Sequence, residues 1–171
     1  MKTQIDNGLL KIYTIGHSNV ELEKFIGLLE FHGVKILADV RSEPYTKYAV
    51  WFNKAPLEKA VLREDIRYVF LGGELGGRPE DPSIYSADGE INYEILKNTA
   101  FFRKGLDNLI KIASGQRTAI MCAEEDPTNC HRSLLIAPAL EARGIEVLHI
   151  RHDGNLVSEI ELRPQQKLLL F

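Results

Sequence analysis

Cysteine is scarce in this chain, which has only Cys122 and Cys130 among its 171 residues. Two cysteines cannot form the disulfide framework of a small secreted domain, and they favour a reducing compartment in which both thiols stay free. Long hydrophobic runs are also missing, since no stretch approaches the roughly 20 apolar residues of a membrane-spanning helix. The first residues lack the apolar core of a signal peptide. We therefore expect a soluble, cytoplasmic protein without a membrane partner.

Charge of one sign is not in excess either. The chain has 21 Lys and Arg residues against 24 Asp and Glu residues, which gives a formal net charge of -3. A protein with this balance lacks the overall positive charge that favours nucleic acid, so contact with nucleic acid would need a local basic surface.

Short apolar runs alternate with segments that have hydrophobic residues at helical spacing. The apolar runs are 11–16, 34–40, 66–71, 117–123 and 145–150. The intervening segments predict helices, of which 92–114 is read as one helix or two, and Asn19 is the expected N-cap of the first. Such alternation is typical of an α/β fold. We predict a Rossmann-like three-layer sandwich, in which a mostly parallel five-stranded sheet carries helices on both faces.

The segment after the fifth run is expected to complete the fold. Residues 152–159 have the composition of a turn, and we expect the apolar residues 167–171 to pack on the body of the protein. No internal repeat or linker is visible in the sequence. Residues 1–171 are therefore predicted to form a single α/β domain.

Reactive side chains are concentrated directly after the predicted strands. In an open parallel sheet, ligands bind outside the carboxyl ends of the strands, near the point where the strand order reverses. A strand order of 3-2-1-4-5 would place strands one and four side by side, with their loops flanking that point. The residues that we expect around one cleft follow strands one to four: His17, Ser18, Asn19, Arg41, Gly76, Gly77, Arg78, Glu124, Cys130, His131 and Arg132.

Cys130 is a candidate catalytic nucleophile. It stands at the expected start of a helix, beside His131 and Arg132, and a helix dipole with neighbouring cations favours a thiolate. The acids at 124–126 oppose this effect. The Cys-x5-Arg pattern of cysteine phosphatases is also missing, because the sixth residue after Cys122 is threonine. A purely structural role for both cysteines, in packing and in fixing the loop, is the alternative.

Glu124 and His17 complete the set of candidate catalytic residues. A carboxylate that directly follows a strand, next to an arginine-lined cleft, suits a general acid, a general base or a glycosyl nucleophile. An enzyme of this kind is expected to hold Glu124 near His17. The next two acids, Glu125 and Asp126, are read as a solvated turn.

Arginines in three of these strand-end loops indicate an anion-binding cleft. The guanidinium fork suits phosphate and carboxylate groups, and glycines at 76 and 77 allow close backbone approach. The predicted anion-binding residues are Ser18, Asn19, Arg41, Gly76, Gly77, Arg78, His131 and Arg132. The alternative is that the arginines brace the loops by pairing with nearby acids, namely Asp39, Glu43, Glu74 or Glu124.

No metal site is assigned. Cys122 and Cys130 are separated by seven residues, and adjacent side chains such as Cys130 and His131 normally point apart. This spacing does not match a structural zinc site. A divalent ion held by carboxylates and water stays open, and no cofactor is identified.

Five ordered motifs resemble domain-of-unknown-function family 488 of bacteria and archaea. They are YTIGHSN (13–19), ADVRSEP (38–44), ELGGRP (74–79), MCAEEDPTNCHR (121–132), and the HI and DG pairs at 149–150 and 153–154. The resemblance covers about residues 11–154. It implies no defined activity, although some members are similar to proteins of DNA repair. After DVR, where members often have a Ser- and Arg-rich stretch, this chain has SEPYTKYAVWFNK, with Lys47 as a basic residue.

Two functions follow from these patterns. The first is a hydrolase or a glycosyl or phosphoryl transferase that acts on a phosphate-bearing small molecule or nucleotide in the strand-end cleft. The second is a non-catalytic module that binds a nucleotide or nucleic acid, with a link to DNA repair. A module of this kind would have an open basic face with exposed aromatic rings that stack on bases. Its candidate residues are Lys47, Lys54, Arg63 and Arg67, with Trp51 and Phe52, although ordinary packing is the preferred interpretation for the two rings.

Overall fold

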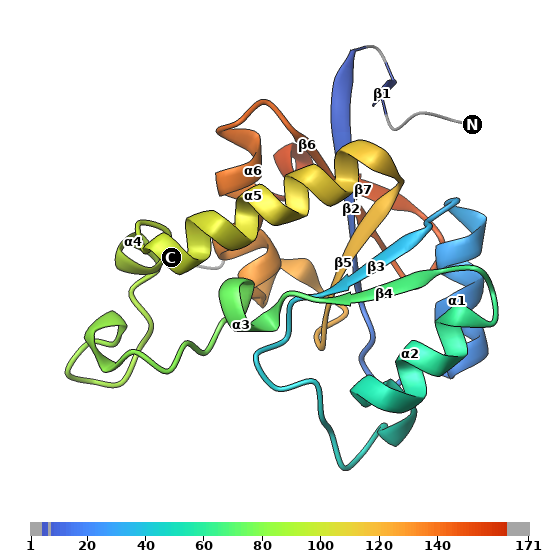
Figure 1. Cartoon of the computed structure of the whole chain (residues 1–171), viewed down its shortest axis with the longest axis horizontal. Coiled ribbons are helices and arrows are strands. Elements are labelled where there is room, and N and C mark those ends of the chain that lie inside the picture. Colours follow the sequence, from blue (N-terminus) through green and yellow to red (C-terminus); the bar gives the residue numbers. More distant parts are fainter. Residues whose placement is uncertain (1–4, 7, 164–171) are drawn as a thin grey trace.

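The structure, a computed structural model, describes residues 5–6 and 8–163. A sheet runs through it in the order β4-β3-β5-β2-β6-β7 (Figure 1). The first five of these strands are parallel, β7 is antiparallel to β6, and the short β1 pairs with β2. The strands are β1 (Ile5–Asp6), β2 (Leu9–Gly16), β3 (Ile36–Asp39), β4 (Arg67–Phe70), β5 (Thr118–Cys122), β6 (Glu146–Ile150) and β7 (Leu156–Ser158).

The mostly parallel sheet of the predicted α/β fold is confirmed. Its five parallel strands, counted along the chain, stand in the order 3-2-4-1-5. β5 therefore lies between β2 and β3, and the loops that follow these three strands meet at one edge of the sheet. β7 is an additional strand at 156–158, where the sequence predicts a turn, because this segment pairs along the edge of β6.

Helices cover both faces of the sheet, as predicted (Figure 1). Successive side chains of β2 alternate between two separate cores: Ile12 packs into one, and Tyr13 and Ile15 pack into the other. The core of Ile12 is closed by α5 (Ala100–Gly115) and α6 (Ala137–Glu141), and that of Tyr13 by α1 (Leu22–Phe31) and α2 (Lys54–Leu62).

Short helical segments fill several connections. They are η1 (Val50–Phe52), α3 (Gly72–Leu75), η2 (Pro82–Ile84), α4 (Tyr93–Leu96), η3 (Pro127–Asn129) and η4 (Arg132–Ile136), the last of which is a π-helical turn that leads into α6. Residues 92–114 thus form two helices. The second begins where the Thr99 side chain accepts a hydrogen bond from the backbone N–H of Phe102.

The predicted N-cap of the first helix is wrong. α1 begins at Leu22 with Glu21 as its N-cap, and Asn19 lies before it. The reason is a turn that delays the helix, closed by a hydrogen bond from the backbone N–H of Val20 to the carbonyl oxygen of His17. The predicted packing of residues 167–171 lies outside the described residues. Among residues 5–6 and 8–163, no helix has the length and hydrophobicity needed to cross a bilayer.

Candidate functional site

The carboxyl ends of β3 and β5 open into a pocket with a volume of about 380 Å³. Its walls come from the segment after β3, the loop after α3, the start of α4 and the loop after β5. Six of the residues expected from the sequence line it: Arg41, Gly77, Arg78, Glu124, Cys130 and His131. Other lining residues include Ser42, Glu43, Tyr45, Tyr93, Cys122 and Asn129. The strand-end loops singled out in the sequence thus supply part of the wall of this pocket.

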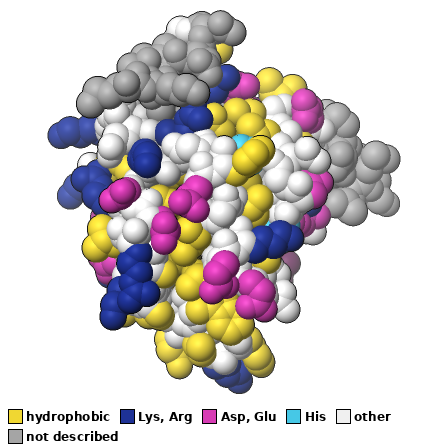
Figure 2. All heavy atoms as spheres, turned by 90° about the vertical axis from the view of Figure 1, so that its right-hand side faces the viewer, with side chains coloured by type: hydrophobic (Ala, Val, Ile, Leu, Met, Phe, Trp, Pro, Cys, Tyr) yellow, Lys and Arg dark blue, Asp and Glu magenta, His cyan; other side chains and the backbone are white. Residues whose placement is uncertain are grey.

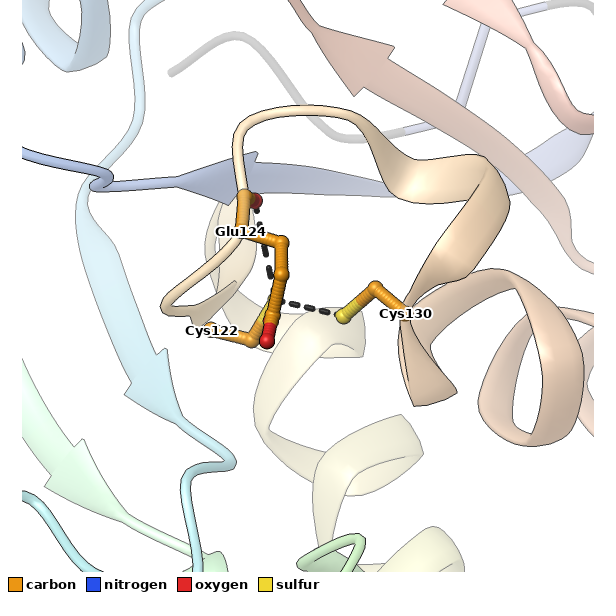
Figure 3. A group of neighbouring side chains, drawn as sticks. All are labelled: Cys122, Glu124 and Cys130. Carbon is orange, nitrogen blue, oxygen red and sulfur yellow. Dashed lines mark hydrogen bonds between the residues drawn. The ribbon is translucent and has the colours of Figure 1, made fainter.

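The loop after β5 turns back and brings Cys130 to Cys122 (Figure 3). Within this loop, the carboxylate of Asp126 accepts hydrogen bonds from the backbone N–H and the hydroxyl of Thr128, at 2.9 and 2.7 Å. The Sγ atoms of Cys122 and Cys130 lie 2.6 Å apart. An oxygen of the Glu124 carboxylate lies 3.5 Å from the Cys122 sulfur, so the three side chains converge at the pocket.

The two cysteines differ in their electrostatic surroundings. A hydrogen bond from the Cys122 thiol lowers the pKa of Cys130 to about 3, against the effect of burial and with the help of His131 and Arg132. Burial raises the pKa of Cys122 well above its usual value. Arg132 Nε donates to the Cys130 sulfur at 3.4 Å. Because the side chains of His131 and Arg132 both contact Cys130, it is the sulfur that carries the negative charge, and Cys122 keeps its proton.

The ring of His131 is held from outside its own loop. Its Nε2 lies 3.1 Å from the carbonyl oxygen of Val40, which can only accept, so Nε2 carries a hydrogen. Its Nδ1 faces the Cys130 sulfur at 3.8 Å. A Cβ added at Gly77 would come within 3.1 Å of the ring, so glycine at this position leaves room for the imidazole. His131 is thus placed to exchange a proton with Cys130.

Arg132 is fully buried and does not line the pocket. Its Nη1 donates to Thr14 Oγ1 at 3.0 Å, and its Nη2 donates to the carbonyl oxygens of Glu124 and Glu125 at 2.5 and 3.3 Å. This position does not agree with the expectation that Arg132 binds an anionic ligand. Its guanidinium instead holds the loop and the charged sulfur of Cys130.

A buried polar network continues from Thr14 across β6. Thr14 Oγ1 lies 2.7 Å from His149 Nδ1, and His149 Nε2 lies 2.7 Å from a carboxylate oxygen of Glu159. The hydroxyl of Ser133 donates to the same carboxylate at 2.8 Å. Each of these side chains is at most 1% exposed. The network fixes the base of the loop that carries Cys130.

His17 and Arg41 form a second buried cluster next to the pocket. Arg41 binds the carboxylate of Asp39 through Nε and Nη2, at 2.9 and 2.7 Å, and its Nη1 donates to His17 Nε2 at 3.2 Å. His17 Nδ1 donates to the carbonyl oxygen of Ser18 at 2.6 Å, and its ring stacks on Phe52. Burial lowers the pKa of His17 to about 4, so the ring is neutral at pH 7.

These contacts change the predicted roles of His17 and Arg41. Both ring nitrogens of His17 are engaged, and the ring does not line the pocket, so it is not a wall of the same cleft as Glu124. Arg41 lines the pocket, but its charge is balanced by Asp39. For Arg41 the structure therefore agrees with the bracing alternative.

The loop after α3 brings Arg78 to the pocket. The backbone N–H of Arg78 donates to the Ser42 hydroxyl at 2.8 Å. A Cβ at Gly76 would lie 2.2 Å from that hydroxyl oxygen, so only glycine lets the two segments pack this closely. Within the described ranges, the exposed guanidinium of Arg78 has no hydrogen bond or ion pair. Arg78 is consequently the cation best placed to bind a ligand.

Ser18 and Asn19 lie apart from the pocket that contains Cys130. Ser18 has a positive φ of 47° and donates its backbone N–H to the carbonyl oxygen of Ala123 at 2.7 Å. It lines a separate shallow hollow with residues 151–153. The structure does not bring these two residues together with Arg78 in one anion site.

The acids that follow Glu124 are not a freely solvated turn. Glu125 accepts two hydrogen bonds from the guanidinium of Arg151, at 2.9 and 3.0 Å, and this pairing lowers its pKa to about 2. Asp126 caps the turn that follows it. Both acids therefore shape the loop.

Tyr93 is a pocket residue that the sequence analysis missed. Burial raises the pKa of its hydroxyl, and the nearby negative charges of Cys130 and Glu124 add to the effect. Tyr93 follows no strand, since it is the first residue of α4. A single aromatic residue at the start of a predicted helix carries no signal that would assign it to the site.

The features expected of a nucleic-acid surface are weak. Phe52 is fully buried, and Trp51 donates its indole N–H to the carbonyl oxygen of Val20 at 3.1 Å, so the two rings serve in packing. Figure 2 shows the face on the side of α1 and α2, where Lys and Arg side chains are interspersed with acidic and hydrophobic ones. This face is not a continuous basic surface.

Cys122, Glu124 and Cys130 are also the described residues that come nearest to a metal-binding group. Their ligand atoms lie within 4.8 Å of one another, and thiolate and carboxylate ligands suit zinc. Two thiolates on one tetrahedral zinc ion are about 3.8 Å apart. The sulfurs here are 2.6 Å apart and would have to separate to hold the ion. The observed separation is therefore too short for two thiolates that share one zinc ion.

Fold and site together define an α/β protein whose strand-end pocket has two thiols in its wall. The family described as Domain of unknown function DUF488 matches residues 21–138, and the chain belongs to this family. A search of curated proteins and a search of solved structures each found no match.

Proposed function

We propose that the protein is an enzyme, a hydrolase or transferase, that uses the Cys130 sulfur as a nucleophile on a phosphate-bearing small molecule or nucleotide. The observation that carries the proposal is the position of this sulfur. It lies in the wall of an open pocket and is contacted by the Cys122 thiol, by Nδ1 of His131 and by Nε of Arg132. A nucleophile, a base next to it, and a group that orients the base form the usual arrangement of covalent catalysis.

The first step is attack by the Cys130 thiolate on the electrophilic atom of the substrate. A bond forms between the sulfur and that atom, and the bond to the leaving group breaks with its electron pair. The leaving group takes up a proton from solvent. In the second step, water or an acceptor alcohol attacks the same atom, His131 or Glu124 takes its proton, and the thiolate leaves.

Arg78 supplies the charge that holds the phosphate. Its guanidinium is exposed beside the pocket, and a planar fork binds phosphate in a bidentate manner. The carboxylates of Glu43 and Glu124 line the same pocket, and Arg41 is balanced by Asp39. We therefore expect the guanidinium of Arg78 to contact the phosphate group of the ligand.

A thermal-shift screen followed by a turnover assay tests the proposal. AMP, ribose 5-phosphate, inorganic phosphate and a set of nucleosides are added to the reduced protein, and ligands of the native state raise its melting temperature. The compounds that bind are then incubated with the enzyme, and products are identified by mass spectrometry. We expect release of phosphate or of a base, and an adduct on Cys130 when the reaction is stopped rapidly with denaturant.

Three variants test whether turnover depends on Cys130 and whether ligand binding depends on Arg78. Cys130→Ser should abolish turnover while leaving the ligand-induced shift intact, and Arg78→Ala should reduce the shift. Arg67→Ala removes an exposed arginine on β4, outside the pocket, and serves as the control. Turnover by Cys130→Ser at the wild-type rate would exclude the nucleophile, and an unchanged shift in Arg78→Ala would exclude the phosphate site.

A further inference from the structure

The two cysteines of the pocket stand in an arrangement suited to oxidation. Their sulfurs are 2.6 Å apart, and a disulfide bond requires a separation of about 2.05 Å. Cys122 ends β5 and Cys130 follows a loop of seven residues, so a shift of about 0.5 Å closes the remaining distance. Both side chains are buried, at 1% and 2% exposure, but both contribute to the pocket wall and are reached through it.

The two sulfurs are not equivalent, and this gives each a role. Arg132 Nε lies 3.4 Å and His131 Nδ1 lies 3.8 Å from the sulfur of Cys130, whereas a carboxylate oxygen of Glu124 lies 3.5 Å from the sulfur of Cys122. A thiolate stabilised by cations reacts with peroxides, and a neutral thiol next to it resolves the product. Cys130 is therefore the sulfur that is oxidised, and Cys122 is the sulfur that closes the disulfide.

We propose that Cys130 and Cys122 form a reversible intramolecular disulfide when a hydroperoxide enters the pocket. The Cys130 thiolate attacks one oxygen of the peroxide, the O–O bond breaks, and the products are Cys130 sulfenic acid and hydroxide, which solvent protonates. The Cys122 sulfur then attacks the sulfenic sulfur and loses its proton, an S–S bond forms, and water leaves. The two electrons lost by the thiols reduce the peroxide, and an external dithiol restores both thiols.

Oxidation changes the pocket in two ways. The disulfide removes the negative charge from Cys130, so Arg132 Nε loses its charged acceptor, and the nucleophile of the proposed function is blocked. It also closes the loop 123–129 onto the end of β5. The inference requires a reactive Cys130 but no turnover of a substrate, so its outcome is separate from that of the proposed function.

Peroxide treatment followed by mass spectrometry tests the inference. The reduced protein is exposed to an equimolar amount of hydrogen peroxide, quenched with N-ethylmaleimide, and analysed as the intact chain and as peptides. We expect a monomer that is lighter by two hydrogens. Neither of its cysteines should react with N-ethylmaleimide, and both should react again after reduction with dithiothreitol. Since the chain has 2 cysteines, such a monomer contains the Cys122–Cys130 bond.

Two variants separate the roles of the sulfurs. Cys122→Ser should stop at the sulfenic acid, heavier by one oxygen and trapped on Cys130 by dimedone. Cys130→Ser should keep its Cys122 thiol fully alkylatable under the same conditions. Peptide analysis separates these products from oxidation of the 2 methionines. The inference is overturned if peroxide-treated wild-type protein keeps both thiols, if it forms only disulfides between chains, or if Cys122 is oxidised as readily in Cys130→Ser.

Discussion

Nε2 of His131 donates its hydrogen to the carbonyl oxygen of Val40, 3.1 Å away on the segment that follows β3. This contact turns Nδ1 toward the sulfur of Cys130, the preceding residue. Adjacent side chains normally point apart. The side chains of Cys130 and His131 meet because the segment that follows β3 anchors the imidazole ring. The positions of the two residues in the sequence therefore do not predict this contact.

Replacing His131 by Gln should raise the pKa of Cys130 by about one unit or more, because an amide can still donate to Val40 but removes the imidazole Nδ1 that faces the sulfur. The measurement is the apparent pKa of Cys130 alkylation by iodoacetamide. His32→Gln is the matched control, because His32 Nε2 contacts the carbonyl oxygen of Gly154 far from the pocket. Identical apparent pKa values in the two variants would rule out a role of His131 in stabilising the thiolate.

Cys122→Ala should also raise the pKa of Cys130, since it removes the thiol that donates to the charged sulfur. Cys122→Ser keeps a donor and should fall between Cys122→Ala and the wild type. A difference of one pKa unit corresponds to about 1.4 kcal/mol of interaction with the charged form. The same alkylation profile measures both variants. If the pKa of Cys130 in Cys122→Ala equals that in the wild type, the hydrogen bond between the two cysteines does not lower this pKa.

Arg132→Lys should lower the free energy of unfolding by about 3 kcal/mol, because a buried charged fork loses two hydrogen bonds that are each worth about 1.5–3 kcal/mol. Urea unfolding monitored by circular dichroism measures this difference. Arg143→Lys is the control, since Arg143 forms an exposed ion pair with Asp107 and should change stability by less than about 1 kcal/mol. Equal effects of the two substitutions would contradict the bracing role of Arg132.

His17 should make the protein sensitive to mild acid. Its pKa is about 4 in the folded state and about 6.5 in the unfolded chain, so the unfolded state binds more protons between these values. The contribution of His17 to the free energy of unfolding is fully present above about pH 6.5. As the pH falls toward 4, up to about 3 kcal/mol of this free energy is lost. Glu125, with a lowered pKa of about 2, loses its contribution in a lower window, below about pH 4.5.

Urea unfolding at several pH values isolates the His17 effect. His17→Gln should flatten the dependence of unfolding free energy on pH between about 6.5 and 4, because glutamine does not titrate. The steeper loss below about pH 4.5 should remain, since it belongs to the carboxylates. An unchanged slope in His17→Gln between these pH values would show that the ring is not held neutral by burial.

The fold followed closely from the sequence because the central strands β3 and β5 are buried on both faces and therefore appear as apolar runs, at 34–40 and 117–123. Strand order did not follow, since it depends on contacts between distant segments. β7 was missed because a short edge strand with exposed and half-buried residues has the composition of a turn.

That these residues follow the strands of the sheet was predictable, but the direction of their side chains was not. Arg41, Arg78 and Arg132 all follow strands, yet Arg41 is paired with Asp39, Arg78 is exposed, and Arg132 is a buried brace. What decides between these outcomes is the set of acceptors supplied by other parts of the chain, such as Thr14 for Arg132. Such acceptors cannot be recognised from the segment that holds the arginine.

The rate of Cys130 alkylation as a function of pH tests most directly whether this residue is a thiolate nucleophile. The reduced protein is treated with iodoacetamide, and labelling of the Cys130 peptide is followed by mass spectrometry. With a pKa lowered by Cys122, His131 and Arg132, the rate should be nearly constant from about pH 5 to about pH 8. A rate that instead rises about tenfold per pH unit up to about pH 8.5, as for an ordinary thiol, would contradict the account.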